Sequence, residues 1–230
     1  TFGFSLKIRL SFHDPKSADK YLGDKKRWEF AEAQLRAMAE ERNADLSEGI
    51  GEAAFYGPKL DFMAKDSLGR DWQVATIQLD MNMPERFDLT CVNEKGEKER
   101  IVMIHAAIMG SIERFLSVLL EHLEGRLPLW LAPVQAKIIP ISEKHLEYAK
   151  SILNELRDSG IRVEVDNSSE TLGKKIRNAK TEKIPYLLVV GEQEAAAKTA
   201  TLESRGAKLG ALPTQEIIHK LQEEIRARAT

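Results

Sequence analysis

The sequence predicts two domains, an α+β domain over residues 1–124 and an α/β domain with a mixed sheet over residues 125–230. Three observations lead to this prediction. Apolar and polar residues alternate over residues 4–12, which is typical of a half-buried strand. The string GRLPLWLAP at residues 125–133 holds two prolines where the pattern changes, which indicates a domain boundary. Beyond that boundary, predicted strands and helices alternate, as in a sheet covered by helices.

The first domain begins with the strand over residues 4–12, followed by a loop and a helix over residues 25–42. Trp28, Ala31, Leu35 and Met38 recur at helical spacing and give this helix an apolar face. The next string, GEAAFYGPKLDF at residues 51–62, is a strand-like run interrupted by two glycines and a proline. Because glycine permits close backbone approaches, we expect a ligand to lie against this segment.

The rest of the first domain is predicted to contain strands, a hairpin and one helix. Residues 72–82 are expected to form a strand, residues 93–100 a polar hairpin tip, and residues 101–110 a buried strand that leads into a helix. The broad apolar face of that helix consists of Ile112, Phe115, Leu116, Leu119, Leu120 and Leu123.

The second domain repeats a strand–helix pattern. Strands are predicted over residues 134–141, 161–166, 184–190 and 198–204, the third of them fully buried. Helices are predicted over residues 143–158, 171–182 and 214–228. This alternation favours a mostly parallel or mixed sheet.

The composition is that of a globular protein, with 43% hydrophobic and 30% charged residues among 230. We find no apolar run long enough to cross a bilayer and no signal peptide. A single cysteine, Cys91, excludes an internal disulfide and suits a reducing cytosol or organelle matrix. The net charge of −2 argues against wholesale coating of nucleic acid but not against a local basic patch. Since Thr1 leads directly into a strand, we expect that a preceding segment has been removed.

Few residues point to chemistry on their own. The common nucleotide, metal and nucleophile motifs are absent, so hydrolase and dinucleotide-binding functions have no support. His105 lies in an apolar run, where a core histidine is commoner than a metal ligand. Glu113 and Arg114 begin an apolar helix, where the guanidinium could clamp a phosphate or form a surface ion pair.

A second candidate is the basic helix TLGKKIRNAKTEK. Its exposed face could contact a phosphate backbone or could be an ordinary solvated face. The cations are Lys174, Lys175, Arg177, Lys180 and Lys183.

The order of four strings resembles the C-terminal half of the threonyl-tRNA synthetases, which are class II enzymes. The strings are GEAAFYGPKLDF, WQVATIQLDMNMPERFDL, VMIHAAIMGSIERF and PLWLAPVQ. The resemblance covers essentially the whole chain. It implies that residues 1–124 form the second half of the antiparallel class II catalytic sheet and that residues 125–230 form an α/β anticodon-binding domain. It also implies a function, as part of a threonine–tRNA ligase that activates threonine with ATP and transfers it to tRNA.

The resemblance also implies roles for individual residues. Tyr56 would contact the threonine amino group, Lys59 would lie near the reacting end of the tRNA, and Gln73 and Gln78 would line the same pocket. His105 would be one of three protein ligands of a catalytic zinc ion that binds threonine.

Glu113 and Arg114 match the motif whose arginine stabilises the ATP phosphates. Lys175, Arg177 and Glu194 match the family in the anticodon domain, and Lys174 lies beside them on the basic helix.

The implied cofactors are Zn²⁺, ATP and Mg²⁺, and the implied partners are threonine, ATP, tRNA(Thr) and a second copy of the intact enzyme. We expect no membrane or DNA partner and a cytoplasmic location, with an organelle matrix as the alternative.

Several departures keep a second hypothesis open. The other zinc ligands and the first two class II motifs fall outside the chain, so this chain alone should hold no catalytic zinc. Ala53 and Ala106 replace a glycine and an arginine of the family. Ser168, Ser169 and the string TLES replace side chains that read RNA. The alternatives are therefore a non-catalytic, diverged paralogue that binds tRNA or a protein, or an inactive fragment.

Overall fold

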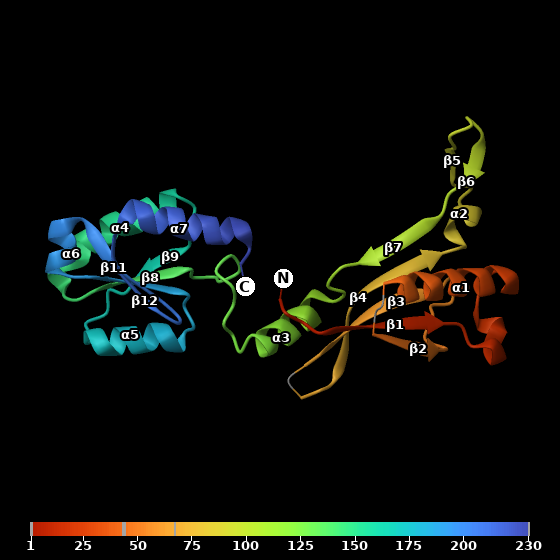
Figure 1. Ribbon diagram of the computed structural model, residues 1–230, viewed down its shortest axis with the longest axis horizontal. Helices are drawn as coiled ribbons and strands as arrows, with labels where there is room; N and C mark the ends of the chain where they lie inside the picture. The colour runs from red at the N-terminus through yellow and green to blue at the C-terminus, as the bar shows by residue number, and fades with distance from the viewer. Residues whose placement is uncertain (1, 43–44, 67, 230) are drawn as a thin grey trace. The chain divides into compact units, whose positions relative to one another are not determined.

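In the computed structural model, which describes residues 2–42, 45–66 and 68–229, the chain divides into two units. One unit is Gly3–His122, and the other comprises Phe2 and the residues from Leu123 onward. No helix in the described residues has both the length and the apolar composition needed to cross a membrane. The fold of each unit is shown in Figure 1.

The first unit is built on a sheet with the strand order β2-β1-β3-β4-β7. Its elements are β1 (Leu6–Phe12), η1 (Pro15–Lys20), α1 (Lys25–Glu41), β2 (Leu46–Ile50), β3 (Lys59–Lys65), β4 (Asp71–Asp80), α2 (Met83–Arg86), β5 (Thr90–Val92), β6 (Lys98–Arg100), β7 (Met103–Ala107) and α3 (Ile112–His122). The described pairs are antiparallel except β1–β2, which is parallel. The sheet is thus mixed, whereas an antiparallel sheet was expected.

Helix α1 covers one face of this sheet. The Asp24 carboxylate caps its first turn by accepting a hydrogen bond from the Lys26 N–H at 2.8 Å. The core beneath the helix consists of Leu10, Phe12 and Ala39, with Ile8, Leu35, Leu46 and Leu60 packed around them. Met38, expected on the apolar face, is instead 58% exposed, and Ala39 takes its place.

Strand β7 differs from its prediction as a buried strand. It pairs with β4 along one edge, and Ile104, His105, Ala106 and Ala107 are all exposed.

Helix α3 is covered on one side only: Phe115, Val118 and Leu119 are buried, while Ile112, Leu116 and Leu120 are 46–48% exposed. Burial depends on the neighbours of a strand, and an apolar run does not reveal them.

The second unit has the predicted mixed sheet, in the order β12-β11-β10-β8-β9. Its elements are β8 (Ala136–Pro140), η2 (Glu143–His145), α4 (Leu146–Asp158), β9 (Val163–Val165), α5 (Leu172–Thr181), β10 (Tyr186–Val190), α6 (Glu192–Ala197), β11 (Thr199–Ser204), β12 (Lys208–Pro213) and α7 (Thr214–Ala227). β10 pairs in parallel with β8 and antiparallel with β11.

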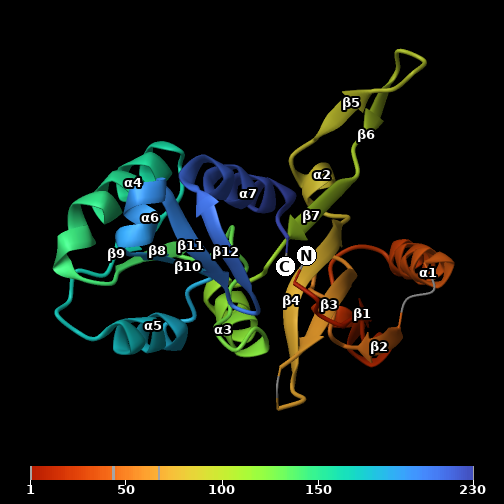
Figure 2. The ribbon, with the colours of Figure 1, turned by 60° about the vertical axis from the view of Figure 1, so that its left-hand side comes forward.

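Alternate side chains of the central strands pack against helices on opposite faces. Ile138 and Leu188 belong to the larger core, whereas Ile139 and Leu187 pack with Ala179 of α5. Figures 1 and 2 both show α5 on one side of this sheet and α4 and α7 on the other. Strand β12 and helix α6 were not predicted, because Lys208–Pro213 is mostly exposed and α6 is short.

Candidate functional site

One row of polar side chains crosses the sheet of the first unit. The strand register places Lys59 of β3 opposite Gln78 of β4, and Gln78 opposite His105 of β7. Residues that are paired in this way project from the same face of a sheet. Because Leu60 packs toward α1, the row lies on the opposite face. The register therefore brings together three of the predicted site residues.

Tyr56 joins this row from the loop before β3. Its hydroxyl donates a hydrogen bond to the Gln78 side-chain oxygen at 2.9 Å, and its ring meets the His105 ring edge-on, with 5.9 Å between centroids. Gln78 is buried, with 8% of its surface exposed. Three candidate binding residues are therefore in mutual contact, and their position depends on the backbone of the loop.

A β-bulge brings Gln73 to the same face. Phe62 pairs with Ala75, but the next residue, Met63, pairs with Gln73, so β4 contains one extra residue, Val74, between them. A bulge reverses the alternation of side chains beyond it. Without the bulge, Gln73 and Gln78, five positions apart, would lie on opposite faces of the sheet.

Asp80 supports the His105 imidazole. The Asp80 Oδ2 atom lies 2.9 Å from His105 Nε2, while Oδ1 accepts hydrogen bonds from the backbone N–H groups of Asn82 and Met83. Burial alone would raise the pKa of Asp80, but these hydrogen bonds outweigh it and hold the pKa below its usual range. The Asp80 carboxylate therefore fixes the ring of a partly exposed histidine.

Lys59 is held by a second buried carboxylate, that of Asp61. The Asp61 Oδ2 atom is 3.0 Å from Lys59 Nζ, 2.7 Å from Ser11 Oγ and 3.3 Å from a terminal nitrogen of Arg9. Burial raises the pKa of Asp61, but the hydrogen bonds from Ser11 and Lys59 lower it by a larger amount. The pKa of Asp61 is therefore below its usual value. Asp61 thus balances two cations on the face that carries Gln78.

Glu113 and Arg114 do not form the surface ion pair that was one alternative. Glu113 accepts a hydrogen bond from Ser111 Oγ at 2.8 Å, and its pKa is lowered by its own backbone N–H and by Ser111. The Arg114 guanidinium lies 5.8 Å from the centroid of the Trp72 ring. Within the part of the chain that the structure describes, no carboxylate pairs with Arg114, so its charge is free for an anionic ligand.

In the second unit, the structure divides the predicted basic face of α5. Lys174 and Arg177 are exposed, although Lys174 forms an ion pair with Glu170 at 2.7 Å. The prediction that Lys175 lies on the same exposed face is wrong. Only 5% of its surface is exposed, and its ammonium group lies 3.5 Å from the Pro140 carbonyl oxygen and 3.4 Å from that of Asp166.

Glu194 is tied to the scaffold of the second unit. Its carboxylate accepts hydrogen bonds from Thr201 Oγ1 at 2.8 Å and from the Gly191 N–H at 3.0 Å. Burial opposes ionisation, but the hydrogen bonds from Thr201 and the backbone lower the pKa of Glu194 overall. Ser168 similarly donates to Asp166 at 2.6 Å. Both side chains have fixed orientations at the carboxyl ends of β8, β9 and β10, where ligands bind to open α/β sheets.

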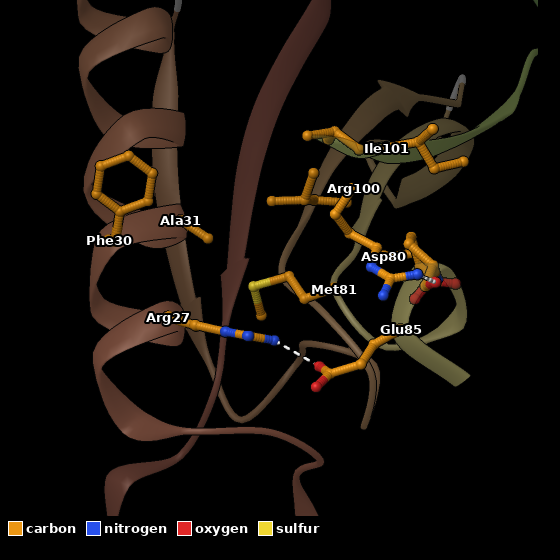
Figure 3. A pocket seen from close by; sticks show the side chains of 11 residues that line it. Arg27, Phe30, Ala31, Asp80, Met81, Glu85, Arg100 and Ile101 are labelled. Atoms are coloured by element: carbon orange, nitrogen blue, oxygen red, sulfur yellow. Dashed lines mark hydrogen bonds and ion pairs between the residues drawn. The ribbon is translucent and has the colours of Figure 1, made fainter. Parts of the chain in front are cut away.

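The first unit also contains a cavity of about 410 Å³, which is lined by residues of α1, the end of β4, α2 and the segment before β7. Figure 3 shows Ala31 of α1 on the side of the helix that faces Met81, with Arg27 reaching to Glu85, at 2.8 Å. Arg100 is paired with Asp88, so both arginines at this cavity already have carboxylate partners. Of the site described above, the cavity touches Asp80 alone.

Among the described residues, the predicted zinc ligand His105 has a supporting carboxylate but no further metal ligands beside it. The hydrogen bond to Asp80 uses His105 Nε2 and leaves Nδ1 for a metal, an arrangement common in metal sites. Among residues 2–42, 45–66 and 68–229, however, no three His, Cys, Asp or Glu side chains gather as a metal site would require. The described residues therefore do not form a complete zinc site.

Sequence reasoning missed Asp61 and Asp80. Each lies within or at the end of a strand rich in apolar residues, and a charged residue there requires a partner when buried. That signal was present in the strings KLDF and QLDMN. It shows that a carboxylate is buried, but not that the partners are Lys59 and His105.

Comparisons with known proteins identify the family to which the chain belongs. A family model described as the tRNA synthetase class II core domain (G, H, P, S and T) matches residues 1–123, and one described as an anticodon binding domain matches residues 135–224. The chain therefore belongs to the class II aminoacyl-tRNA synthetases.

Similar proteins within this family are named threonine–tRNA ligases. The chain is 47% identical over its full length to a threonine–tRNA ligase of Prosthecochloris aestuarii, and 46% identical over 96% of its length to one of Thermus thermophilus. It spans about a third of each of these relatives, at 35% and 34%. A solved structure of the RNA binding domain of threonyl-tRNA synthetase from Cryptosporidium parvum matches 97% of the chain and 56% of its own, with 39% identity and a TM-score of 0.88.

Proposed function

We propose that the chain is the C-terminal portion of a threonine–tRNA ligase, with the end of the class II catalytic domain in residues 1–124 and the anticodon-binding domain in residues 125–230. The observation that carries the proposal is the mutual contact of Tyr56, Gln78 and His105 in a chain that matches threonine–tRNA ligases over its full length.

In this function the polar face of the first unit binds threonine and the adenylate. Tyr56 and Gln73 orient the amino acid, and Gln78 holds the Tyr56 hydroxyl in place. Lys59 lies near the reacting end of the tRNA, with its ammonium group positioned by Asp61. Because these groups are fixed before substrate arrives, they contribute through positioning and preorganised charge.

The intact enzyme would carry out two steps. The threonine carboxylate attacks the α-phosphate of ATP, which forms the threonyl adenylate and releases pyrophosphate. A hydroxyl of the terminal tRNA ribose then attacks the adenylate carbonyl, which forms threonyl-tRNA and releases AMP. Arg114 has no carboxylate partner in the described residues and would stabilise the ATP phosphates, with Mg²⁺ as their counterion and Glu113 beside it. His105 would supply one ligand to a zinc ion. When bound, that ion would recognise the amino and hydroxyl groups of threonine.

The second unit would bind tRNA(Thr). Lys174 and Arg177 offer exposed positive charge, and Glu194 presents a carboxylate of fixed orientation. The burial of Lys175 favours a structural role for that residue. A cytoplasmic or organelle-matrix location and a dimeric intact enzyme are part of the same proposal.

The test is threonine-dependent ATP–pyrophosphate exchange, measured on the natural polypeptide that contains this chain. Replacing Arg114 with alanine should lower the exchange rate about 100-fold or more. Arg27→Ala, which removes a charge from an exposed ion pair elsewhere in the same unit, should change it less than about twofold. An Arg114 variant as active as the Arg27 variant would contradict the assigned role.

The competing function is a non-catalytic module that binds tRNA. Glu203 lies where, by the resemblance, the family reads RNA, and it forms an ion pair with Lys180. This pairing favours the alternative. No exchange activity in the natural polypeptide, together with retained tRNA binding, would establish it.

A further inference from the structure

A cluster of four cations surrounds a small cavity in the second unit. The cavity has a volume of about 220 Å³, and its charged lining residues are Arg126, Lys180, Lys183 and Arg205. Ile184, Pro185 and Leu187 form its apolar wall. We call these four cations and the cavity between them the basic pocket. They come from the segment after α3, the last turn of α5, the turn before β10 and the residue after β11.

Arg205 holds the walls of the basic pocket together. Its guanidinium donates hydrogen bonds to the carbonyl oxygen of Leu127, at 2.7 Å, and to that of Lys183. Both acceptors are neutral, so the charge of Arg205 is oriented without being neutralised. Burial and the nearby charge of Arg126 lower the pKa of Arg205.

The carboxylates around the basic pocket do not balance its cations. Lys180 is paired with Glu203 at 2.6 Å. Arg126 is 3.6 Å from Glu124, but both side chains are mostly exposed, and such pairs contribute little. Within the described residues, neither Lys183 nor Arg205 forms an ion pair with a carboxylate, although the negative charge of Glu224 partly offsets the effects that lower the pKa of Arg205. The pocket therefore carries excess positive charge that an anion would neutralise.

We propose that the basic pocket binds a phosphate group of an RNA backbone. Guanidinium groups bind phosphate through paired donors, and lysine adds a mobile point charge. The pocket lies before the start of β10, whereas Glu194 follows the end of that strand. It would therefore add a second, sequence-independent contact at the opposite end of the strand from Glu194. This inference rests on the proposed tRNA-binding function and extends it to a new position.

The test compares two double variants of the 230-residue chain. Arg126→Gln with Lys183→Gln removes two charges from the basic pocket and leaves the hydrogen bonds of Arg205 in place. Lys220→Gln with Arg226→Gln removes the same two charge types from exposed positions of α7, on the other face of the sheet. Binding of unfractionated tRNA is measured over a series of salt concentrations.

If the basic pocket holds RNA phosphates, the first double variant should bind tRNA more weakly. The slope of log affinity against log salt should be less steep by about 0.7 to 0.9, the contribution of the one phosphate contact that the pocket would make. The α7 variant should keep the slope of the parent chain. Equal slopes in the two variants would overturn the proposal.

A second measurement separates RNA from a free anion and from failure of the proposed function. Inorganic phosphate is titrated into the isotope-labelled chain while the backbone amide signals of Lys183, Ser204 and Ala207 are followed by NMR. If these signals shift in the parent but not in the pocket variant, while tRNA affinity is equal in both, the pocket binds a free phosphate and the RNA assignment is wrong. Absence of tRNA binding by the parent would overturn the proposed function and the RNA assignment, but phosphate-induced shifts would still identify an anion site. If the parent chain does not bind tRNA and phosphate shifts none of these amide signals, the basic pocket is not an anion site.

Discussion

Gly57 and Leu79 are in direct backbone contact: a methyl group at Gly57 would lie 1.8 Å from the Leu79 carbonyl oxygen. The Leu79 N–H donates a hydrogen bond to the Pro58 carbonyl oxygen at 3.1 Å. The loop before β3 is therefore attached to the end of β4, and this attachment brings the Tyr56 hydroxyl to Gln78. The close approach that requires glycine at position 57 is that of the protein backbone, and a ligand against this segment stays a prediction.

Replacing Gly57 with alanine should therefore be strongly destabilising. The added methyl group cannot avoid a backbone carbonyl by rotating, so the loop and β4 must separate. We expect the free energy of unfolding to fall by about 2 kcal/mol or more, as measured by urea denaturation. Gly49→Ala is a suitable control, because the atoms nearest to its methyl group belong to the side chains of Glu52 and Arg9, which can move. Equal losses in the two variants would mean that the Gly57 contact is not a special constraint.

Much of the fold was predictable because its signals are local. Apolar residues at helical spacing gave α4 and α7, and the buried run at residues 184–190 gave β10. The parallel strand β2 was not predictable, because Leu46–Ile50 contains a glycine and mostly exposed residues. Its pairing with β1 depends on the chain returning past α1, which no local pattern describes.

The candidate site was predicted from a resemblance rather than from physical patterns. Nothing local to Lys59, Gln78 or His105 indicates that they share a row, since strand register links residues far apart in sequence. The bulge that turns Gln73 to the same face leaves no clear mark in the string WQVAT. For Lys175 a local pattern was misleading. Its charge suggested an exposed side chain, but its position on α5 places it against the sheet.

Asp61→Asn should destabilise the first unit because Lys59 and Arg9 would lose their shared carboxylate. Hydrogen bonds to charged groups contribute about 1.5–3 kcal/mol, and unpairing partly buried cations adds to the loss. We expect the free energy of unfolding to fall by about 2–3 kcal/mol in urea denaturation. Asp45→Asn removes a carboxylate from an exposed pair with Lys7, and should cost less than about 1 kcal/mol. If both variants lose the same stability, Asp61 does not have the role assigned to it.

Asp66 should make stability depend on pH in the acid range. Burial raises the pKa of Asp66, but hydrogen bonds from the Trp72 indole and from the backbone and guanidinium of Arg70 lower it to about 2, against an ordinary 3.8. Since the pKa is depressed in the folded state, the stabilisation is fully present above about pH 4 and is lost as pH falls toward 2.

Urea denaturation of the parent chain and of Asp66→Asn between pH 7 and pH 3 tests this expectation. The variant should be less stable than the parent at pH 7, and the difference should begin to shrink as the pH falls below about 4. A difference that stays constant down to pH 3 would contradict the assigned shift.

Lys175→Met should preserve both stability and RNA binding. The side chain is 5% exposed, its ammonium group meets two backbone carbonyl oxygens at 3.4 and 3.5 Å, and it forms no ion pair within the described residues. Replacing a buried charge with an apolar side chain of similar length is often neutral or stabilising. We expect a free energy of unfolding equal to that of the parent chain or about 1 kcal/mol higher.

The matched variant for RNA binding is Lys174→Gln with Arg177→Gln, on the exposed side of the same helix. If α5 contacts a phosphate backbone, this double variant should weaken tRNA binding and make its salt dependence less steep, whereas Lys175→Met should leave both unchanged. The two outcomes separate a cation that supports the fold from cations that meet a ligand. A loss of tRNA affinity in Lys175→Met as large as in the double variant, at unchanged stability, would show that Lys175 leaves its buried position to bind RNA.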